Sequence, residues 1–173
     1  MSAPELSRLV RLDSLGPAPR TVAVEAGEAE RSALARRFGF VALCRLCAEV
    51  ELTRRGEAVS ARGTLSAELV QSCVATGEPI AETVEQAFKV EFRRHPAAPA
   101  DVEIELGEGE LDVTFYDGAA IDIGEAVAET LSLAVEPFPR CPGADQALRK
   151  AGVKTEEEAG PFGALAGLRD KLK

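Results

Sequence analysis

The stretch FVALCRLCAEVELTRRGEAVSARGTLSAELVQSC, residues 40–73, decides the fold of this chain. Apolar side chains alternate with polar ones over residues 40–54, and a second alternating run covers residues 59–73. The tripeptide Arg55-Gly56-Glu57 lies between the two runs and has the composition of a turn. Alternation with a period of two places successive side chains on opposite faces of a strand. The pattern therefore predicts a long antiparallel β-hairpin with one buried face.

Sequence on either side of the hairpin predicts more strands. They are expected at residues 6–12, 21–25, 80–92, 102–106 and 111–115. Residues 93–99 contain two prolines, which cannot donate to a strand ladder, so this segment is expected to be an exposed connector.

Two helices are predicted from composition and from their end signals. The first covers residues 28–38 and ends at Gly39, because glycine is a common helix C-cap. The second begins after the N-cap Asp122, with Glu125 placed three residues on to complete a capping box. Its apolar stripe, at a spacing of four residues, consists of Ile123, Val127 and Leu131.

A length of 173 residues predicts one globular domain, or one domain with a tail. We expect an α+β fold, with an antiparallel β meander or partly closed sheet, a long hairpin and two or three flanking helices. The domain is predicted to span residues 1–139. A flexible C-terminal tail, 140–173, is predicted to carry a short amphipathic helix, because Phe162, Leu165 and Leu168 recur at helical spacing.

Charge is distributed unevenly along the chain. The chain has 20 Lys and Arg residues against 29 Asp and Glu residues, a net charge of -9. Residues 101–139 hold 11 of the acidic side chains and no Lys or Arg. This balance argues against attraction of the whole molecule to nucleic acid or to an anionic membrane. No apolar run is long enough to span a membrane, and Glu5 and Arg8 interrupt any secretory signal, so we expect a cytoplasmic protein.

The cysteines do not form a convincing metal motif. Cys44 and Cys47 are three residues apart, a spacing that puts their side chains on opposite faces of an extended strand. Cys73 and Cys141 are isolated in the sequence, and His95 is the only histidine. Small buried side chains are the favoured interpretation of the cysteines. The alternative is a zinc or thiol-redox module that uses Cys44 and Cys47.

Motifs of known catalytic chemistry are missing from the sequence. It contains no GxSxG, no phosphate-binding P-loop and no GxGxxG. Carboxylates between residues 101 and 129 alternate with apolar side chains and are expected to face solvent. A hydrolytic or nucleolytic activity would instead require these carboxylates to gather in a cleft. The prediction is a protein that is not an enzyme and has no catalytic, cofactor or metal site.

Basic side chains occur in pairs at predicted surface positions. Arg54 and Arg55 lie at the hairpin tip, and Arg93 and Arg94 lie beside the proline-rich connector. The tail adds Arg169 and Lys171. Solvated surface charge is the simpler interpretation of each pair, and contact with RNA phosphate is the alternative.

Three motifs give the chain a resemblance to a known family. They are VQSCVATGEPI at 70–80, AIDI at 120–123 followed by AETLSL at 128–133, and PFGALAGLR at 161–169. In this order they resemble the YceD family, bacterial and plastid proteins of large ribosomal RNA subunit accumulation. The family's CxxC is similar to Cys73-Val74-Ala75-Thr76 here, with Thr76 in place of the second cysteine. Any zinc site that other members hold is therefore expected to be lost, because too few thiolates remain.

The resemblance implies a role in ribosome biogenesis, in 23S rRNA accumulation or processing and in assembly of the large subunit. We expect a non-enzymatic adaptor that binds an assembling particle or a basic ribosomal or assembly protein. The acidic segment would engage this basic partner, and the basic pairs would contact rRNA. Candidate partner-binding residues are Asp112, Asp117, Asp122, Glu125, Glu129, Phe162, Leu165 and Leu168; candidate RNA contacts are Arg54, Arg55, Arg93, Arg94, Arg169 and Lys171.

Overall fold

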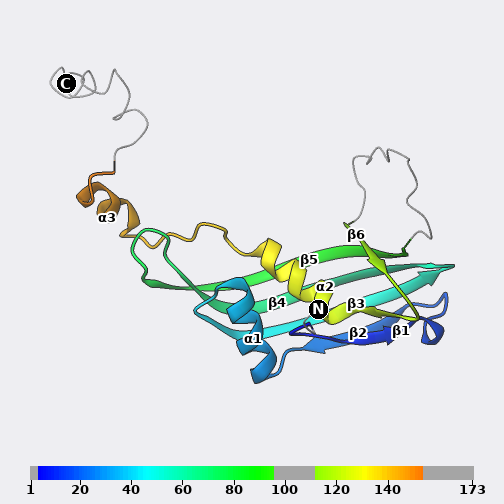
Figure 1. Cartoon of the computed structure of the whole chain (residues 1–173). Helices are drawn as coiled ribbons and strands as arrows, with labels where there is room; N and C mark the ends of the chain where they lie inside the picture. The colour runs from blue at the N-terminus through cyan, green and yellow to red at the C-terminus, as the bar shows by residue number, and fades with distance from the viewer. Residues whose placement is uncertain (1–3, 96–111, 154–173) are drawn as a thin grey trace, which may run out of the picture. The chain divides into compact units, whose positions relative to one another are not determined.

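The computed structural model describes residues 4–95 and 112–153 (Figure 1). These residues divide into two compact units. Unit 1 lies within residues 4–71 and 81–136, and unit 2 comprises 72–80 and 137–153. The predicted strand at 102–106 and the predicted helix of the tail lie outside the described residues. The predicted domain boundary at residue 139 stays a prediction.

A five-stranded sheet forms the centre of the fold, with strand order β2-β3-β4-β5-β6 (Figure 1). The strands are β2 (Arg20–Glu25), β3 (Ala42–Arg55), β4 (Ala58–Ser72), β5 (Pro79–Arg94) and β6 (Asp112–Tyr116). Strands β2 and β4 each pair with β3 in the antiparallel direction. The predicted hairpin is confirmed: Arg55 pairs with Ala58 across a two-residue turn. Gly56 takes a positive φ of 64° in that turn, a conformation that glycine adopts readily.

Strand β6 corrects the expected antiparallel meander. It pairs with β5 in the parallel direction, with Val90 opposite Asp112 and Arg94 opposite Tyr116. Parallel neighbours require the chain to cross back to the same end of the sheet before the second strand starts. The side-chain alternation that predicted this strand is the same for either direction of pairing, so the sequence pattern did not reveal the crossover.

A second sheet joins two short strands from distant parts of the chain. Strand β1 (Leu9–Arg11) pairs in the antiparallel direction with β7 (Ala120–Asp122). The expected strand at 6–12 is therefore shorter than predicted, because the chain turns into a 3-10 helix, η1 (Leu12–Ser14), directly after Arg11. Strand β7 was not predicted.

Three helices complete the described part of the chain. Helix α1 (Glu28–Phe38) has the predicted bounds and ends at Gly39, which has a φ of 73°. Helix α2 (Ile123–Ala134) follows Asp122 as expected. Helix α3 (Ala144–Lys150) belongs to unit 2 and lies where a flexible tail was predicted. The fold is thus α+β, and the described strands form no closed barrel.

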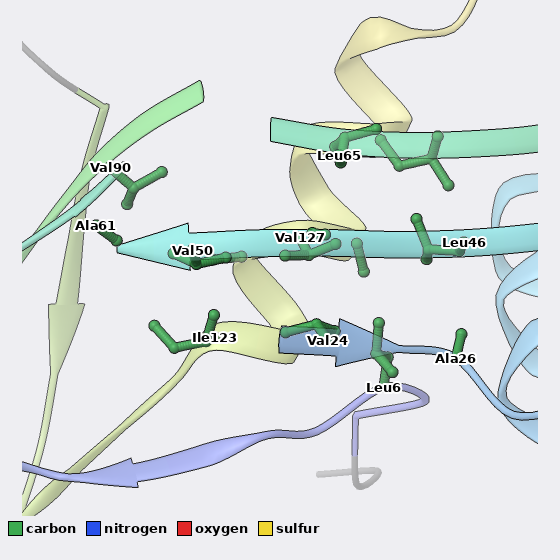
Figure 2. Packing of buried hydrophobic residues seen from close by; sticks show 14 of the residues in the cluster. Leu6, Val24, Ala26, Leu46, Val50, Ala61, Leu65, Val90, Ile123 and Val127 are labelled. Atoms are coloured by element: carbon green, nitrogen blue, oxygen red, sulfur yellow. The ribbon is translucent and has the colours of Figure 1, made fainter. Parts of the chain in front are cut away.

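The core of unit 1 lies between the five-stranded sheet and α2. Figure 2 shows Ile123 and Val127 of α2 beside Val24 of β2 and Val50 of β3. Leu131 extends the same helical stripe and is fully buried, as are Ile123 and Val127. The predicted apolar stripe is therefore confirmed as the face of α2 that covers the sheet.

Gly63 in β4 has no room for a side chain, which gives a first prediction. A Cβ at this position would lie 2.4 Å from the carbonyl oxygen of Glu49 and 3.1 Å from the Cα of Val50. Both atoms belong to the backbone of β3, so they cannot move without disturbing the hairpin. Gly63→Ala is expected to lower the free energy of unfolding by about 1–3 kcal/mol, the usual cost of overpacking.

Chemical denaturation of the two purified proteins would measure this loss. Gly16→Ala is the matched control, because the nearest heavy atom to its added Cβ would be 4.0 Å away. Equal stability of the Gly63→Ala variant and the parent protein would contradict the close contact between β3 and β4.

Candidate partner-binding surface and cysteine turn

Asp122 ties the N-terminal segment to the start of α2. Its carboxylate accepts hydrogen bonds from the backbone N–H groups of Gly124 and Glu125, at 3.0 and 3.3 Å, as an N-cap does. It also accepts the hydroxyl of Ser7 at 2.6 Å and the backbone N–H of Arg8 at 2.8 Å. This carboxylate, predicted as a partner contact, is engaged by four donors within the chain.

Glu125 makes an ion pair in place of the predicted capping-box bond. Both of its carboxylate oxygens accept hydrogen bonds from the guanidinium of Arg37, at 2.7 and 3.0 Å. Arg37 also binds Glu5 at 2.9 Å and lies over the ring of Phe38. These contacts raise the pKa of Arg37, chiefly through the hydrogen bond to Glu125. The arrangement links α1, α2 and the N-terminal segment.

A second ion pair holds the start of α1. The guanidinium of Arg8 donates to both oxygens of Glu30, at 2.7 and 2.9 Å. Glu30 also accepts the backbone N–H of Gly27 at 2.7 Å. The hydrogen bond from Arg8 is the main reason that the pKa of Glu30 falls to about 2. Arg8 and Arg37 thus fix the two ends of α1 to neighbouring segments.

The other predicted acidic contacts are exposed where the structure describes them. Asp112 lies at the start of β6, Asp117 follows its end, and Glu129 lies on α2. Desolvation raises the pKa of Glu129, and the negative charge of Glu125 raises it further. Phe162, Leu165 and Leu168 lie outside the described residues.

The solvent side of α2 carries an exposed apolar residue that is not among the predicted partner contacts. Leu133 is 83% exposed, whereas Leu131, two residues earlier in the same helix, is fully buried. Glu125, Glu129 and Leu133 are spaced by four residues and therefore follow one side of the helix. We call these three side chains the outer ridge of α2. Each of the three residues lies two positions after a residue of the buried stripe, which places it on the opposite side of the helix. This spacing could have identified them from the sequence.

Most of the predicted RNA contacts that the structure describes make bonds within unit 1. Arg54 donates to the carbonyl oxygens of Leu12 and Gly56, at 2.6 and 2.8 Å. Arg93 pairs with Glu91 at 2.6 Å, and Arg94 pairs with Glu57 at 3.0 Å. Arg55 is exposed and lines a shallow hollow on the open face of the sheet, together with Arg62 and Lys89. Arg169 and Lys171 lie outside the described residues.

The expectation that the cysteines are small buried side chains is wrong for Cys44. The β3–β4 register shifts between Leu43 and Arg45, and Cys44 is exposed at this bulge. A bulge interrupts the alternation on which the expectation rested. Cys47 is half-buried. Over residues 4–95 and 112–153, no group of three or more His, Cys, Asp and Glu side chains is arranged to hold a metal ion.

Unit 2 brings Cys73 and Cys141 together. Residues 72–80 form a turn in which the N–H of Gly77 donates to the carbonyl of Cys73 at 2.9 Å. The backbone N–H of Val74 reaches the carbonyl of Pro139, also at 2.9 Å. This contact aligns the two segments, and the N–H of Cys141 then donates to the sulfur of Cys73 at 3.3 Å. We call the side chains of Cys73, Thr76 and Cys141 the cysteine turn.

The cysteine turn favours ionisation of Cys73. The N–H of Cys141 and the hydroxyl of Thr76 lower the pKa of the Cys73 thiol to about 6, although burial acts in the opposite direction. The pKa of Cys141 is raised, with contributions from the Glu78 carboxylate, desolvation and the Cys73 thiol that outweigh the hydrogen bond to Thr76. The two thiols of one contact pair therefore differ in their readiness to ionise.

This low pKa gives a second prediction. An acidic group whose pKa is lowered in the folded state releases its proton more readily there than in the unfolded chain. The ionised form therefore adds stability that is lost as the pH falls from about 9, its ordinary value, to about 6. In the presence of a reductant, the stability of unit 2 is expected to rise with pH across this window.

Hydrogen exchange of the amides of residues 72–80 at several pH values would measure this dependence. The Cys73→Ser variant is expected to lose it, because its hydroxyl does not ionise in the same range. A Cys73→Ser variant with the same pH dependence as the parent protein would rule out the thiol as its source.

Comparisons with known proteins agree with the resemblance found in the sequence motifs. A family model described as "Large ribosomal RNA subunit accumulation protein YceD" matches residues 61–169. No curated protein and no solved structure matched the chain. Among the described helices, none has the length and apolar character needed to cross a membrane. The matched region is more than half of the chain and includes α2 and both cysteines of unit 2; the protein belongs to the YceD family, which is named for large ribosomal RNA subunit accumulation.

Proposed function

We propose that this protein is a non-enzymatic adaptor in assembly of the large ribosomal subunit, and that it supports 23S rRNA accumulation in the cytoplasm. Its partner is a basic ribosomal or assembly protein, which binds the outer ridge of α2. The observation that carries this proposal is the highly exposed Leu133, with the exposed carboxylate of Glu129 on the same side of the helix. Apolar and acidic groups together fit a partner segment that offers apolar and cationic side chains.

Charge around α2 favours a cationic partner. No Lys or Arg occurs between Asp112 and Pro139, and Asp112 and Asp117 are exposed. Glu129 is destabilised in its ionised form by desolvation and by the negative charge of Glu125. A Lys or Arg of the partner would relieve this repulsion, so binding is expected to favour the ionised carboxylate.

RNA is the less favoured direct partner. The carboxylates near α2 repel phosphate, and Arg54, Arg93 and Arg94 already bind acceptors within the chain. Arg55 and the tail residues Arg169 and Lys171 remain the candidate RNA contacts of this proposal. They would supplement the protein contact.

A charge reversal on the outer ridge tests the proposal. In cells that lack the gene, the variant Glu129→Lys with Leu133→Arg is expected not to restore the ratio of 23S to 16S rRNA. Its purified form is expected to lose a basic ribosomal or assembly protein in pull-downs from cells. The control Glu85→Lys reverses the charge of an exposed carboxylate of β5, outside α2, and is expected to behave as the parent protein.

Two outcomes would contradict the proposal. If gene removal leaves 23S rRNA unchanged, the protein has no role in its accumulation. If the captured partner is RNA that resists protease and dissociates steeply with salt, the direct contact is with nucleic acid. Metal analysis of the reduced protein would test the zinc form of the alternative module at Cys44 and Cys47, which requires stoichiometric zinc.

A further inference from the structure

Unit 2 holds two reduced thiols close enough to be joined. Cys73 and Cys141 are 68 residues apart in sequence, yet the backbone nitrogen of Cys141 lies 3.3 Å from the sulfur of Cys73. One N–Cα bond adds about 1.5 Å, so this sulfur lies within about 4.8 Å of the Cα of Cys141. The hydroxyl oxygen of Thr76 lies 3.4 Å from the sulfur of Cys141, so the Cys141 side chain also lies against the 72–80 turn. Such separations are within reach of disulfide geometry after a small change of rotamer.

The two sulfurs differ in their protonation at neutral pH. Cys73 has a pKa of about 6 and is mostly thiolate at neutral pH, because the N–H of Cys141 and the hydroxyl of Thr76 stabilise the negative charge. Thiolates are the nucleophilic form of cysteine. Cys141 has a raised pKa and stays protonated beside it. A low-pKa thiol next to a second cysteine is the arrangement of redox-sensitive cysteine pairs.

We propose that Cys73 and Cys141 form a reversible, peroxide-sensitive disulfide that joins the 72–80 turn to the segment before α3. The site is independent of the outer ridge of α2. Cys73 is 2% exposed, so the oxidant must be small, and hydrogen peroxide fits this limit. In a reducing cellular compartment such a bond is transient and acts as a sensor.

The reaction with hydrogen peroxide balances in two steps. The Cys73 thiolate attacks one peroxide oxygen, the O–O bond breaks, and the departing hydroxide takes up a proton to give water. Cys73 is left as a sulfenic acid. The sulfur of Cys141 then attacks the sulfur of Cys73 and loses its proton, while the S–O bond breaks and a second water leaves. Two thiols lose two electrons in total, the peroxide gains them, and a thiol reductant reverses the change.

Peptide mapping of the full chain tests this pair against the other two cysteines. The reduced protein is treated with hydrogen peroxide, its remaining thiols are alkylated under denaturing conditions, and the peptides are analysed by mass. The expected product is a cross-link between Cys73 and Cys141, formed at lower peroxide than any bond between Cys44 and Cys47. A dithiol reductant is expected to remove it.

Variants separate the two steps. Cys44→Ser with Cys47→Ser is expected to retain the cross-link. Cys141→Ser is expected to leave Cys73 as a sulfenic acid, which dimedone traps when the oxidised protein is unfolded in its presence. Oxidation of Cys44 and Cys47 while Cys73 stays open to alkylation would overturn the proposal. This outcome is measured on the parent protein, so the test does not depend on the folding of a variant.

Discussion

Replacing Leu131 by alanine is expected to lower the free energy of unfolding by about 2–5 kcal/mol, the range for large-to-small changes in a packed core. Leu131 is fully buried and lies on the helical stripe that begins with Ile123 and Val127. Truncation would remove its contacts with the sheet and leave a cavity between α2 and the strands, because close-packed neighbours collapse only in part. Urea denaturation followed by circular dichroism would measure the loss.

Leu133→Ala is the matched control, with the same change two residues further along α2. Because Leu133 is 83% exposed, its truncation is expected to change stability by no more than about 0.5 kcal/mol. The same variant is expected to weaken partner binding if the outer ridge is the docking surface. Equal losses of stability from the two variants would mean that α2 does not cover the sheet through the buried stripe.

Asp122→Ala is expected to lower the free energy of unfolding by about 2–4 kcal/mol, from loss of a helix cap together with newly unpaired donors. Four donors lose their acceptor: the hydroxyl of Ser7 and the N–H groups of Arg8, Gly124 and Glu125. The loss would affect the start of α2 and the attachment of the N-terminal segment together. Thermal denaturation and hydrogen exchange at residues 7–11 would measure both.

Two further variants sharpen this experiment. Asp122→Asn keeps one oxygen acceptor and the size of the side chain, so its loss is expected to be smaller than that of alanine. Asp117→Ala removes an exposed carboxylate five residues earlier and is expected to leave stability nearly unchanged. If Asp122→Ala is as stable as Asp117→Ala, the described hydrogen bonds do not hold the N-terminal segment.

Local patterns predicted the elements whose signals are short-range. Alternation over residues 40–73 predicted the hairpin, and Gly39 predicted the end of α1. The periodicity of α2 predicted its buried stripe. In each case the residues that form the pattern are the same residues that form the hairpin or the helix. Such elements can therefore be predicted from one sequence.

Long-range pairing was beyond these patterns. Alternation predicted a strand at residues 6–12, but it indicated neither the end of β1 at Arg11 nor its partner. Strand β7 has three residues and is too short to show a periodicity. The parallel direction of β6 depends on the path of the connecting chain. Alternation alone also could not reveal the bulge at Cys44, where one additional residue shifts the register.

The candidate site was predicted only in outline. The acidic segment around α2 was found from composition, but composition could not distinguish Asp122 and Glu125, which bind within the chain, from the exposed Glu129. The contact between Cys73 and Cys141 has no sequence signal, because it depends on the turn at 72–80 meeting a segment far along the chain.

Pairing of β1 with β7 has a consequence for how the chain folds during its own synthesis. Leu9 pairs with Asp122 and Arg11 with Ala120, so β1 cannot pair with β7 until translation has passed residue 122. The hairpin of β3 and β4 involves neighbouring residues and can form much earlier, since contacts of low sequence separation form fast. We expect the N-terminal residues of a nascent chain stalled before residue 120 to remain open to protease while the hairpin is already protected.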